Sequence, residues 1–119
     1  MEFVMLTYAT EAGAEAYDLA TPEEIAANIE LHEQWFAANR GSITAGYHLA
    51  WPRRWGRIAA QQQMVVHDGP FAETKEALGG VIVLTAGSLD DALAIAETWP
   101  SLDSPYGGVV EVMPLGGFA

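Results

Sequence analysis

The sequence predicts an α+β domain in which a mainly antiparallel sheet carries two helices on one face. Two helix starts with recognisable N-caps alternate with short, apolar, β-prone runs, in the order strand, helix, two strands, strand, helix, strand. The 119 residues contain no linker, internal repeat or low-complexity stretch, and half of them are hydrophobic. We therefore expect residues 1–119 to form one domain with a buried core.

The first third of the chain supplies one strand and one helix. Residues 3–8 form an apolar run typical of a strand, and residues 9–20 have the composition of a loop. Thr21-Pro22-Glu23-Glu24 is a helix start, because threonine caps the helix, proline suits its first turn and Glu24 completes a capping box. The helix is expected to run to about Asn39 and to be stopped by Gly41.

One face of this helix is apolar. At about 100° per residue, Ile25, Ile29, His32 and Phe36 lie within about 60° of one another. His32 is thus expected in the middle of a buried stripe. A histidine in that position is either a functional side chain or a core residue that hydrogen-bonds to a backbone carbonyl.

The middle of the chain is rich in strands. Residues 42–51 and 58–67 are predicted to form one long hairpin, with a loop at 52–57 between them. Residues 78–85, which include a run of four aliphatic side chains, form the clearest strand of the sequence.

The last third adds a helix and a strand. Ser88 caps a helix that ends before Pro100, and residues 109–113 form the final strand. The resulting order is that of a ferredoxin-like βαββ(β)αβ domain with one added hairpin element. Because residues 81–84 and 109–113 are apolar at nearly every position, both faces of the sheet should be covered. Two helices cover one face, so we expect a second copy on the other and a homodimer.

Composition excludes several classes of function. Sixteen acidic and five basic side chains give a formal charge of −11, so neither nucleic acid nor a membrane is expected as a partner. No stretch approaches the roughly 18 apolar residues of a membrane span and no export signal is visible, so we expect a cytoplasmic protein. The absence of cysteine removes thiol chemistry. No set of histidine and carboxylate side chains has ligand spacing, so no metal is expected. No nucleotide-binding glycine loop is present, because Gly79-Gly80 and Gly116-Gly117 lack the required spacing, so no cofactor is expected.

The stretch from Asp68 to Glu76 combines a strand end, a tight turn and a cluster of charges. Because Pro70 has no N–H, Asp68 cannot close the simplest Asx turn, and its carboxylate is available to another partner. His67 precedes Asp68 directly, but neighbours on a strand point to opposite faces. The two are therefore not expected to form a pair.

The string Asp68-Gly69-Pro70-Phe71-Ala72-Glu73-Thr74-Lys75-Glu76, with residues 78–80 and the closing stretch 108–115, resembles the DGPF branch of the YCII-related family. The resemblance extends from the first strand to the last. It implies a dimeric α/β barrel made from two ferredoxin-like subunits. It also implies a site that pairs a helix histidine with the first aspartate of the string, positions matched here by His32 and Asp68.

The resemblance also bears on function. Relatives include a dehydrochlorinase that acts on a chlorinated hydroxyquinol, together with lactone isomerases and monooxygenases. We therefore expect His32 and Asp68 to perform general acid/base chemistry on a small cyclic or aromatic organic acid. The alternative is a non-catalytic ligand-binding or regulatory dimer, because genes of this branch often neighbour extracytoplasmic-function sigma factors. His48 is either a third polar member of the site or a surface histidine.

An arginine- and tryptophan-rich stretch is a second candidate feature. Arg53, Arg54 and Arg57 surround Trp55 and are suited to bind the carboxylate or phenolate of a substrate by forked hydrogen bonds and stacking. Glu73 is a further candidate for the same cleft. The alternative for the arginines is pairing with the chain's own acids or packing in a dimer interface.

Overall fold

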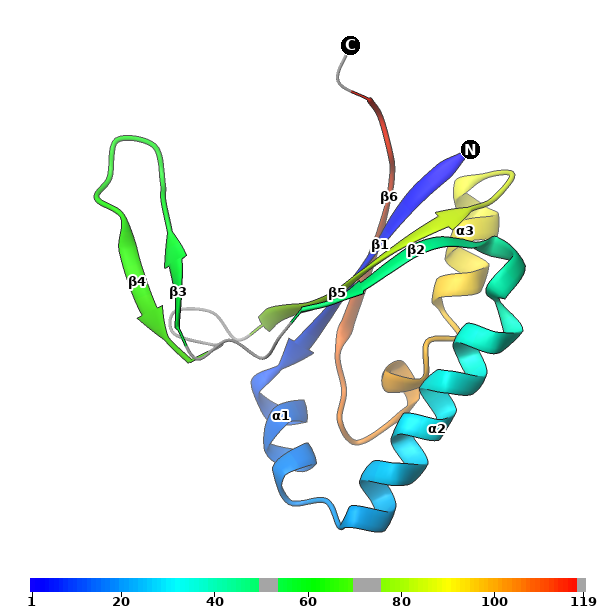
Figure 1. Cartoon of the computed structure of the whole chain (residues 1–119), viewed down its shortest axis with the longest axis horizontal. Coiled ribbons are helices and arrows are strands. Elements are labelled where there is room, and N and C mark those ends of the chain that lie inside the picture. Colours follow the sequence, from blue (N-terminus) through cyan, green and yellow to red (C-terminus); the bar gives the residue numbers. More distant parts are fainter. Residues whose placement is uncertain (50–53, 70–75, 118–119) are drawn as a thin grey trace.

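The computed structural model describes residues 1–49, 54–69 and 76–117 (Figure 1). Its strands are β1 (Glu2–Thr10), β2 (Ile43–His48), β3 (Arg54–Arg57), β4 (Val65–Asp68), β5 (Glu76–Thr85) and β6 (Val109–Pro114). Its helices are α1 (Glu11–Asp18), α2 (Pro22–Ala38) and α3 (Leu89–Ala96), and short 3-10 helices span Arg40–Ser42 and Pro100–Asp103.

Four of the strands form one sheet in the order β2-β5-β1-β6, in which every neighbouring pair is antiparallel. Helices α2 and α3 lie on one side of this sheet, and α1 follows β1 at one end (Figure 1). This is the ferredoxin-like α+β arrangement that the sequence predicts. No helix among the described residues is long and apolar enough to span a membrane.

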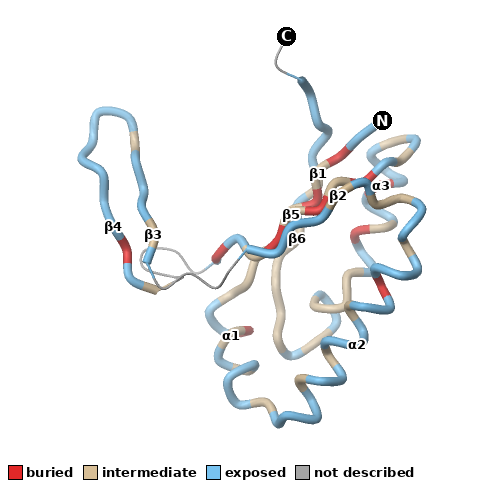
Figure 2. Tube along the Cα trace, in the orientation of Figure 1, coloured by how far each residue is buried: buried red, intermediate tan, exposed pale blue. Residues whose placement is uncertain are grey.

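The hydrophobic core lies between the sheet and these two helices (Figure 2). Its buried cluster combines side chains from both layers: Met5, Trp35, Ile82, Leu84 and Ala96. The other face of the sheet carries Val4, Leu6, Val81 and Val83, which alternate with the buried positions and are only half-buried in the single chain. The apolar character of both sheet faces is thus as predicted, with one face packed by helices.

The apolar stripe predicted for α2 is only partly buried. Trp35, expected at the side of the stripe, is 5% exposed, whereas Ile29 and Phe36 are 49% and 37% exposed. The reason is that Ile29, His32 and Phe36 face a cavity rather than closely packed side chains. His32 itself is half-buried.

The capping box predicted at the start of α2 is present. The Thr21 hydroxyl accepts a hydrogen bond from the Glu24 N–H at 3.2 Å, and the Glu24 carboxylate accepts one from the Thr21 N–H at 3.0 Å. These bonds lower the pKa of Glu24 below its ordinary value. The stabilisation they give is therefore present above the unfolded pKa of Glu24 and is lost as pH falls through its lowered folded value.

Replacement of Thr21 by alanine is expected to destabilise the protein by about 1 kcal/mol, because the Glu24 N–H in the first turn loses the hydroxyl that accepts its hydrogen bond. Urea denaturation at neutral pH measures the change. Thr21→Ser is the matched control, since its hydroxyl keeps the bond to the Glu24 N–H. Equal stability of the alanine and serine variants would contradict the assignment of the cap.

The segment 9–20, expected to be a loop, is instead the end of β1 followed by α1. The Thr10 hydroxyl caps this helix by accepting from the Gly13 N–H at 3.1 Å. A glycine inside a helix lowers its intrinsic stability, which is why composition favoured a loop. Here Gly13 is required by packing, because a Cβ at this position would overlap the Tyr106 carbonyl.

The long hairpin predicted from residues 42–51 and 58–67 is wrong. Strand β2 pairs with β5, with Ile43 opposite Leu84. A separate hairpin forms from β3 and β4, so residues 54–57 are a strand rather than a loop. The reason is burial, since the alternate side chains of β5 are in the core and make it the better partner for β2. The predicted turn after β4 is supported by Gly69, whose φ of 78° suits glycine.

Candidate functional site

A cavity of about 990 Å³ lies between α2 and the sheet, with residues of α1 at one end. Its lining comes from α1, α2, strands β1, β2 and β5, and the connection between α3 and β6. The polar residues of its lining include His32, His48, Tyr17, Ser101 and Tyr106. This is the size and character of a pocket for a small organic molecule, because most of the lining is apolar and a few polar groups converge on it.

His32 is held in one orientation by hydrogen bonds at both ring nitrogens. Its Nδ1 lies 2.7 Å from the Asn28 carbonyl oxygen, one turn earlier on α2, and its Nε2 lies 2.9 Å from the Ser101 hydroxyl. A carbonyl can only accept, so in the neutral ring Nδ1 carries the proton and Nε2 accepts from the Ser101 O–H. The basic nitrogen of His32 is therefore directed at a serine hydroxyl that also lines the cavity.

The surroundings of His32 follow from the end of α3. Helix α3 ends at Ala96, and Trp99 is the N-cap of the 3-10 helix Pro100–Asp103, which brings Ser101 opposite α2. The Trp99 ring contacts the His32 ring edge-to-face, with centroids 4.8 Å apart. Trp99 also contacts the rings of Trp35 and Phe36 at 4.9 and 5.8 Å, so an aromatic cluster fixes the position of the histidine.

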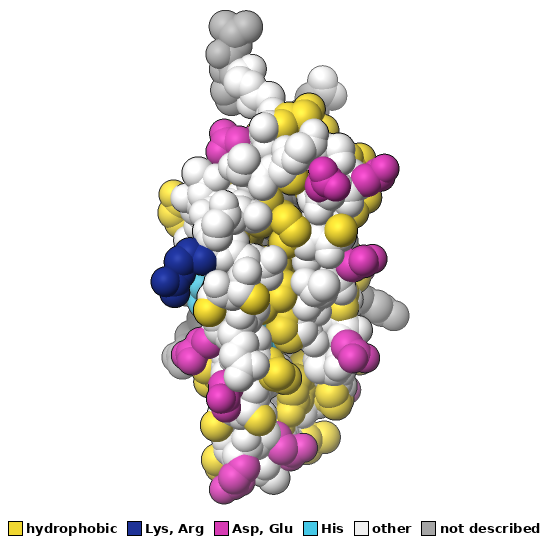
Figure 3. Space-filling model, turned by 90° about the vertical axis from the view of Figure 1, so that its right-hand side faces the viewer, with side chains coloured by type: hydrophobic (Ala, Val, Ile, Leu, Met, Phe, Trp, Pro, Cys, Tyr) yellow, Lys and Arg dark blue, Asp and Glu magenta, His cyan; other side chains and the backbone are white. Residues whose placement is uncertain are grey.

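The charges at the cavity are negative. Among the described residues, its lining includes the carboxylates of Asp18 and Glu33 and neither lysine nor arginine. The helical side of the molecule carries a strip of hydrophobic side chains, with acidic groups along both edges and a basic group at the left edge (Figure 3). A ligand anion would therefore meet no lysine or arginine side chain among the described residues that line the cavity.

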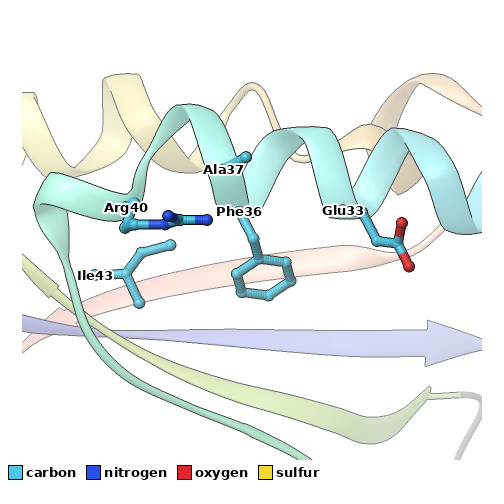
Figure 4. Close-up of a pocket in the computed structure, with 5 residues that line it drawn as sticks. All are labelled: Glu33, Phe36, Ala37, Arg40 and Ile43. Atoms are coloured by element: carbon cyan, nitrogen blue, oxygen red, sulfur yellow. The ribbon is translucent and has the colours of Figure 1, made fainter.

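A smaller hollow of about 360 Å³ lies beside the cavity, toward the C-terminal end of α2. It is lined by Glu33, Phe36, Ala37, Arg40 and Ile43. Figure 4 shows Phe36 between Arg40 and Glu33, with its ring directed toward the sheet. Glu33, Phe36 and Ile43 also line the larger cavity, so the two spaces are neighbours.

The predicted site residues are distributed over two regions. His32 lines the cavity, whereas Asp68 is the last residue of β4 and is exposed. Figure 1 shows the β3–β4 hairpin on the opposite side of the molecule from α2. The cavity of one described chain thus contains His32 without Asp68, and their pairing stays a prediction.

The arginine and tryptophan candidates also lie on the hairpin. Arg54 and Arg57 are exposed at the two ends of β3. Trp55, between them, is half-buried and donates its indole N–H to the Gly69 carbonyl at 2.7 Å. Arg53 and Glu73 lie outside the described residues.

His67 points away from Asp68, as predicted. It is 7% exposed and packs on the ring of Trp55 at a centroid distance of 4.6 Å, whereas Asp68 is exposed. Within the described chain, the buried Nε2 of His67 has no hydrogen-bond partner. This histidine therefore serves the packing of the hairpin and does not line the cavity.

Sequence reasoning missed several lining residues. His48, for which a surface position was one expectation, lines the cavity with His32. Ser101, Tyr17 and Tyr106 lie in segments interpreted as turn or loop, and no spacing rule connects them with the histidine. Ser101 and His32 are 69 residues apart in the chain. Only the packing of the 3-10 helix against α2 brings them together.

Tyr8, on β1, has a pKa raised above its ordinary value. A hydrogen bond from its hydroxyl to the Glu111 carboxylate is the largest cause, followed by burial and by the negative charges of Glu111 and Glu76. All of these favour the neutral phenol over the phenolate. The contribution of Tyr8 to the stability of the folded protein is therefore fully present below the pKa of this tyrosine in the unfolded chain. It is lost as pH rises through the raised pKa in the folded protein.

Ultraviolet titration is expected to resolve Tyr8 as a tyrosine that ionises above the ordinary value of 10.0. Tyr8→Phe should remove this late transition from the absorbance curve. Glu111→Gln should shift it to lower pH, because the acceptor loses its charge. A titration curve that is the same in the parent and the Tyr8→Phe variant would contradict the assignment.

No group of three or more histidine, aspartate or glutamate side chains in the described ranges has the arrangement of a metal site. The features that do define this protein are a ferredoxin-like α+β fold and a small-molecule cavity with an oriented histidine. A sequence model of the YCII-related domain matches residues 1–118. The chain therefore belongs to the YCII-related family, as the sequence resemblance implied.

Two further relatives are informative. An uncharacterised protein of Rhizobium meliloti (strain 1021) is 45% identical over 53 residues, which cover 44% of this chain and 42% of that protein. The solved structure of 5-chloro-2-hydroxyhydroquinone dehydrochlorinase from Burkholderia phenoliruptrix, in complex with 2,5-dihydroxybenzoquinone, matches 98% of this chain and 94% of that one. Its TM-score is 0.57 at 13% sequence identity, so this likeness shows the fold.

Proposed function

We propose that the protein is a small enzyme in which His32 exchanges a proton with a ligand bound in the cavity between α2 and the sheet. The observation that supports this most directly is the pair of hydrogen bonds that fixes the His32 ring and directs its Nε2 to Ser101. Imidazole titrates near neutrality, so a fixed ring at a cavity wall is suited to general acid/base chemistry.

In this proposal Ser101 lies between His32 and the ligand. As the ligand gives a proton to the Ser101 oxygen, the Ser101 proton passes to His32 Nε2, and the reverse transfer returns a proton to product. The Asn28 carbonyl accepts from Nδ1 throughout, so the ring keeps its orientation when it is protonated. Proton transfer of this kind requires no organic cofactor.

The proposed ligand is a small ring compound with hydroxyl or carbonyl groups. Aromatic and aliphatic side chains provide flat apolar contacts, and the serine, histidine and tyrosine side chains provide hydrogen bonds. A fold neighbour, 5-chloro-2-hydroxyhydroquinone dehydrochlorinase, was solved in complex with 2,5-dihydroxybenzoquinone, which supports this class of ligand. Recognition of an organic acid would additionally require a cation, for which Arg54 and Arg57 remain the proposed source.

The predicted pairing of His32 with Asp68 is retained as part of the proposal, with Asp68 supplied across the interface of a homodimer. A carboxylate beside the ring would stabilise the imidazolium that forms during proton transfer. In the described chain the Asn28 carbonyl and the Ser101 hydroxyl already orient the His32 ring. The Asp68 carboxylate would therefore add charge stabilisation and would not be needed for orientation.

A ligand screen tests the proposed function. Hydroquinone, catechol and 2-hydroxybenzoquinone would be compared with 2,5-dihydroxybenzoate by the shift of thermal unfolding, and each binder would be incubated and analysed by chromatography. We expect ring compounds to stabilise the protein and at least one to be converted. Ser101→Ala should reduce conversion, because the proton relay is interrupted.

Binding without conversion, with the same affinity in His32→Gln and the parent protein, would contradict the enzymatic proposal. It would favour the alternative of a ligand-binding or regulatory dimer. Co-purification with an extracytoplasmic-function sigma factor, altered by the bound compound, would then be the result to seek.

A further inference from the structure

The β3–β4 hairpin is separate from the rest of the fold. We name residues 54–69 the arm. In the described chain its strands pair only with each other and not with the four-stranded sheet. The arm projects away from the body in Figure 1, and the radius of gyration is 15.8 Å, larger than the roughly 13.5 Å of a compact domain of this length.

The arm has a defined internal structure. Trp55 lies directly opposite His67, their rings pack together, and the Trp55 N–H donates to the Gly69 carbonyl. The arm is therefore preorganised and loses little conformational freedom when it binds.

The arm also exposes more apolar surface than an isolated hairpin is expected to carry. Ile58 is 80% exposed and Met64 is 61% exposed, and Val65 and Val66 are nearly half exposed. Figure 2 shows the arm as mostly exposed along its length. A two-stranded hairpin is marginally stable in water, so these side chains need a surface on which to pack.

Charge indicates which surface this is. The arm contains Arg54, Arg57 and one acid, Asp68, whereas residues 1–49 and 76–117 contain fourteen acidic side chains and one basic side chain, Arg40. The arm and the body therefore have opposite charge. The open sheet face of the body, with its half-buried valines and Leu6, supplies apolar surface as well.

We propose that the arm of each chain packs on the body of a second copy of this protein, so that two chains exchange arms about a two-fold axis. The opposite charges and the apolar side chains of arm and body are then complementary in both directions, as two-fold symmetry requires. In this arrangement Asp68, Arg54 and Trp55 are presented to the partner. This last consequence rests on the proposed function, since it assigns these residues to the neighbouring cavity rather than their own.

Photo-crosslinking tests the contact directly, because the chain contains no cysteine. Ile58→Cys, directly after β3 in the arm, would be coupled to a benzophenone maleimide. The coupled protein would be prepared with ¹⁵N and mixed with an equal amount of ¹⁴N protein. We expect crosslinked peptides that join the arm of one isotope to the body of the other. Asp90→Cys, on the first turn of α3, provides a control probe away from the arm.

Charge reversal tests the electrostatic part. Arg54→Glu combined with Arg57→Glu is expected to raise the dimer dissociation constant about tenfold or more, because each arm then carries the same sign as the body. Sedimentation equilibrium measures this constant, and the effect should decrease at high salt. Arg40→Glu is the matched control, since it changes the charge of the body outside the arm.

A monomer at all concentrations, or crosslinks that join only peptides of the same isotope, would overturn the proposal. The proposal would also be overturned if the double arginine variant dimerised with unchanged affinity and the arm formed no crosslink to any body peptide. None of these measurements uses a ligand, so a failure of the proposed enzymatic function would leave them unaffected.

Discussion

Replacement of His32 by glutamine is expected to lower the turnover of a converted ligand by about 10²–10⁴-fold, the usual contribution of a general acid/base group. Glutamine is similar in reach and retains hydrogen-bonding capacity toward Ser101 and the Asn28 carbonyl. It cannot accept and return a proton at neutral pH. The loss should therefore appear in turnover more than in ligand binding.

The measurement is the rate of conversion at saturating ligand, with folding monitored by near-ultraviolet circular dichroism. Glu30→Gln is the matched control, because Glu30 is an exposed residue of the same helix and does not line the cavity. Turnover that is the same in His32→Gln and the parent would exclude His32 as the proton-transfer group.

Replacement of Trp35 by alanine is expected to cost about 3–5 kcal/mol of stability, the range found when a large aromatic side chain is removed from a core. Trp35 packs between the sheet and α3 and contacts the Phe36 and Trp99 rings. Its N–H also donates to the Thr98 hydroxyl. The expected loss is a large fraction of the roughly 5–15 kcal/mol that holds a typical domain together.

Urea denaturation at a fixed protein concentration measures this loss, since association changes apparent stability. Trp35→Phe separates its two causes, because phenylalanine keeps most of the apolar contact and removes only the indole donor. We expect this variant to be clearly more stable than Trp35→Ala. Equal losses in both variants would show that the hydrogen bond to Thr98 dominates over packing.

Local signals in the sequence predicted the elements that have strong local causes. The capping box at Thr21 and the cap at Ser88 defined the starts of α2 and α3, and the aliphatic run of β5 defined the central strand. Helix α1 was missed because Gly13 reduces helix propensity, and its packing against Tyr106 is a tertiary contact. The pairing of β2 was missed because strand pairing depends on burial in the assembled sheet.

The residues of the candidate site also differ in whether a local sequence signal could predict them. The spacing of apolar residues along α2 identified His32, because it places the histidine on the same helix face as Ile29 and Phe36. The partners of His32 depended on different information: Asn28 lies one helical turn away, but Ser101 is in a distant segment whose position is set by the end of α3. The family resemblance supplied Asp68, and the structure places it on the arm rather than at the cavity of the same chain.

Strand order has a consequence for synthesis on the ribosome. The first strand to be made, β1, lies between β5 and β6, and the partner hydroxyl of His32 comes from residue 101. Neither the complete four-stranded sheet, which needs β6, nor the oriented histidine, which needs Ser101, can form before these C-terminal residues have left the ribosomal exit tunnel. Until β5 has emerged, the apolar β1 segment has no partner strand in the sheet, so the nascent chain exposes an unpaired apolar segment during this interval.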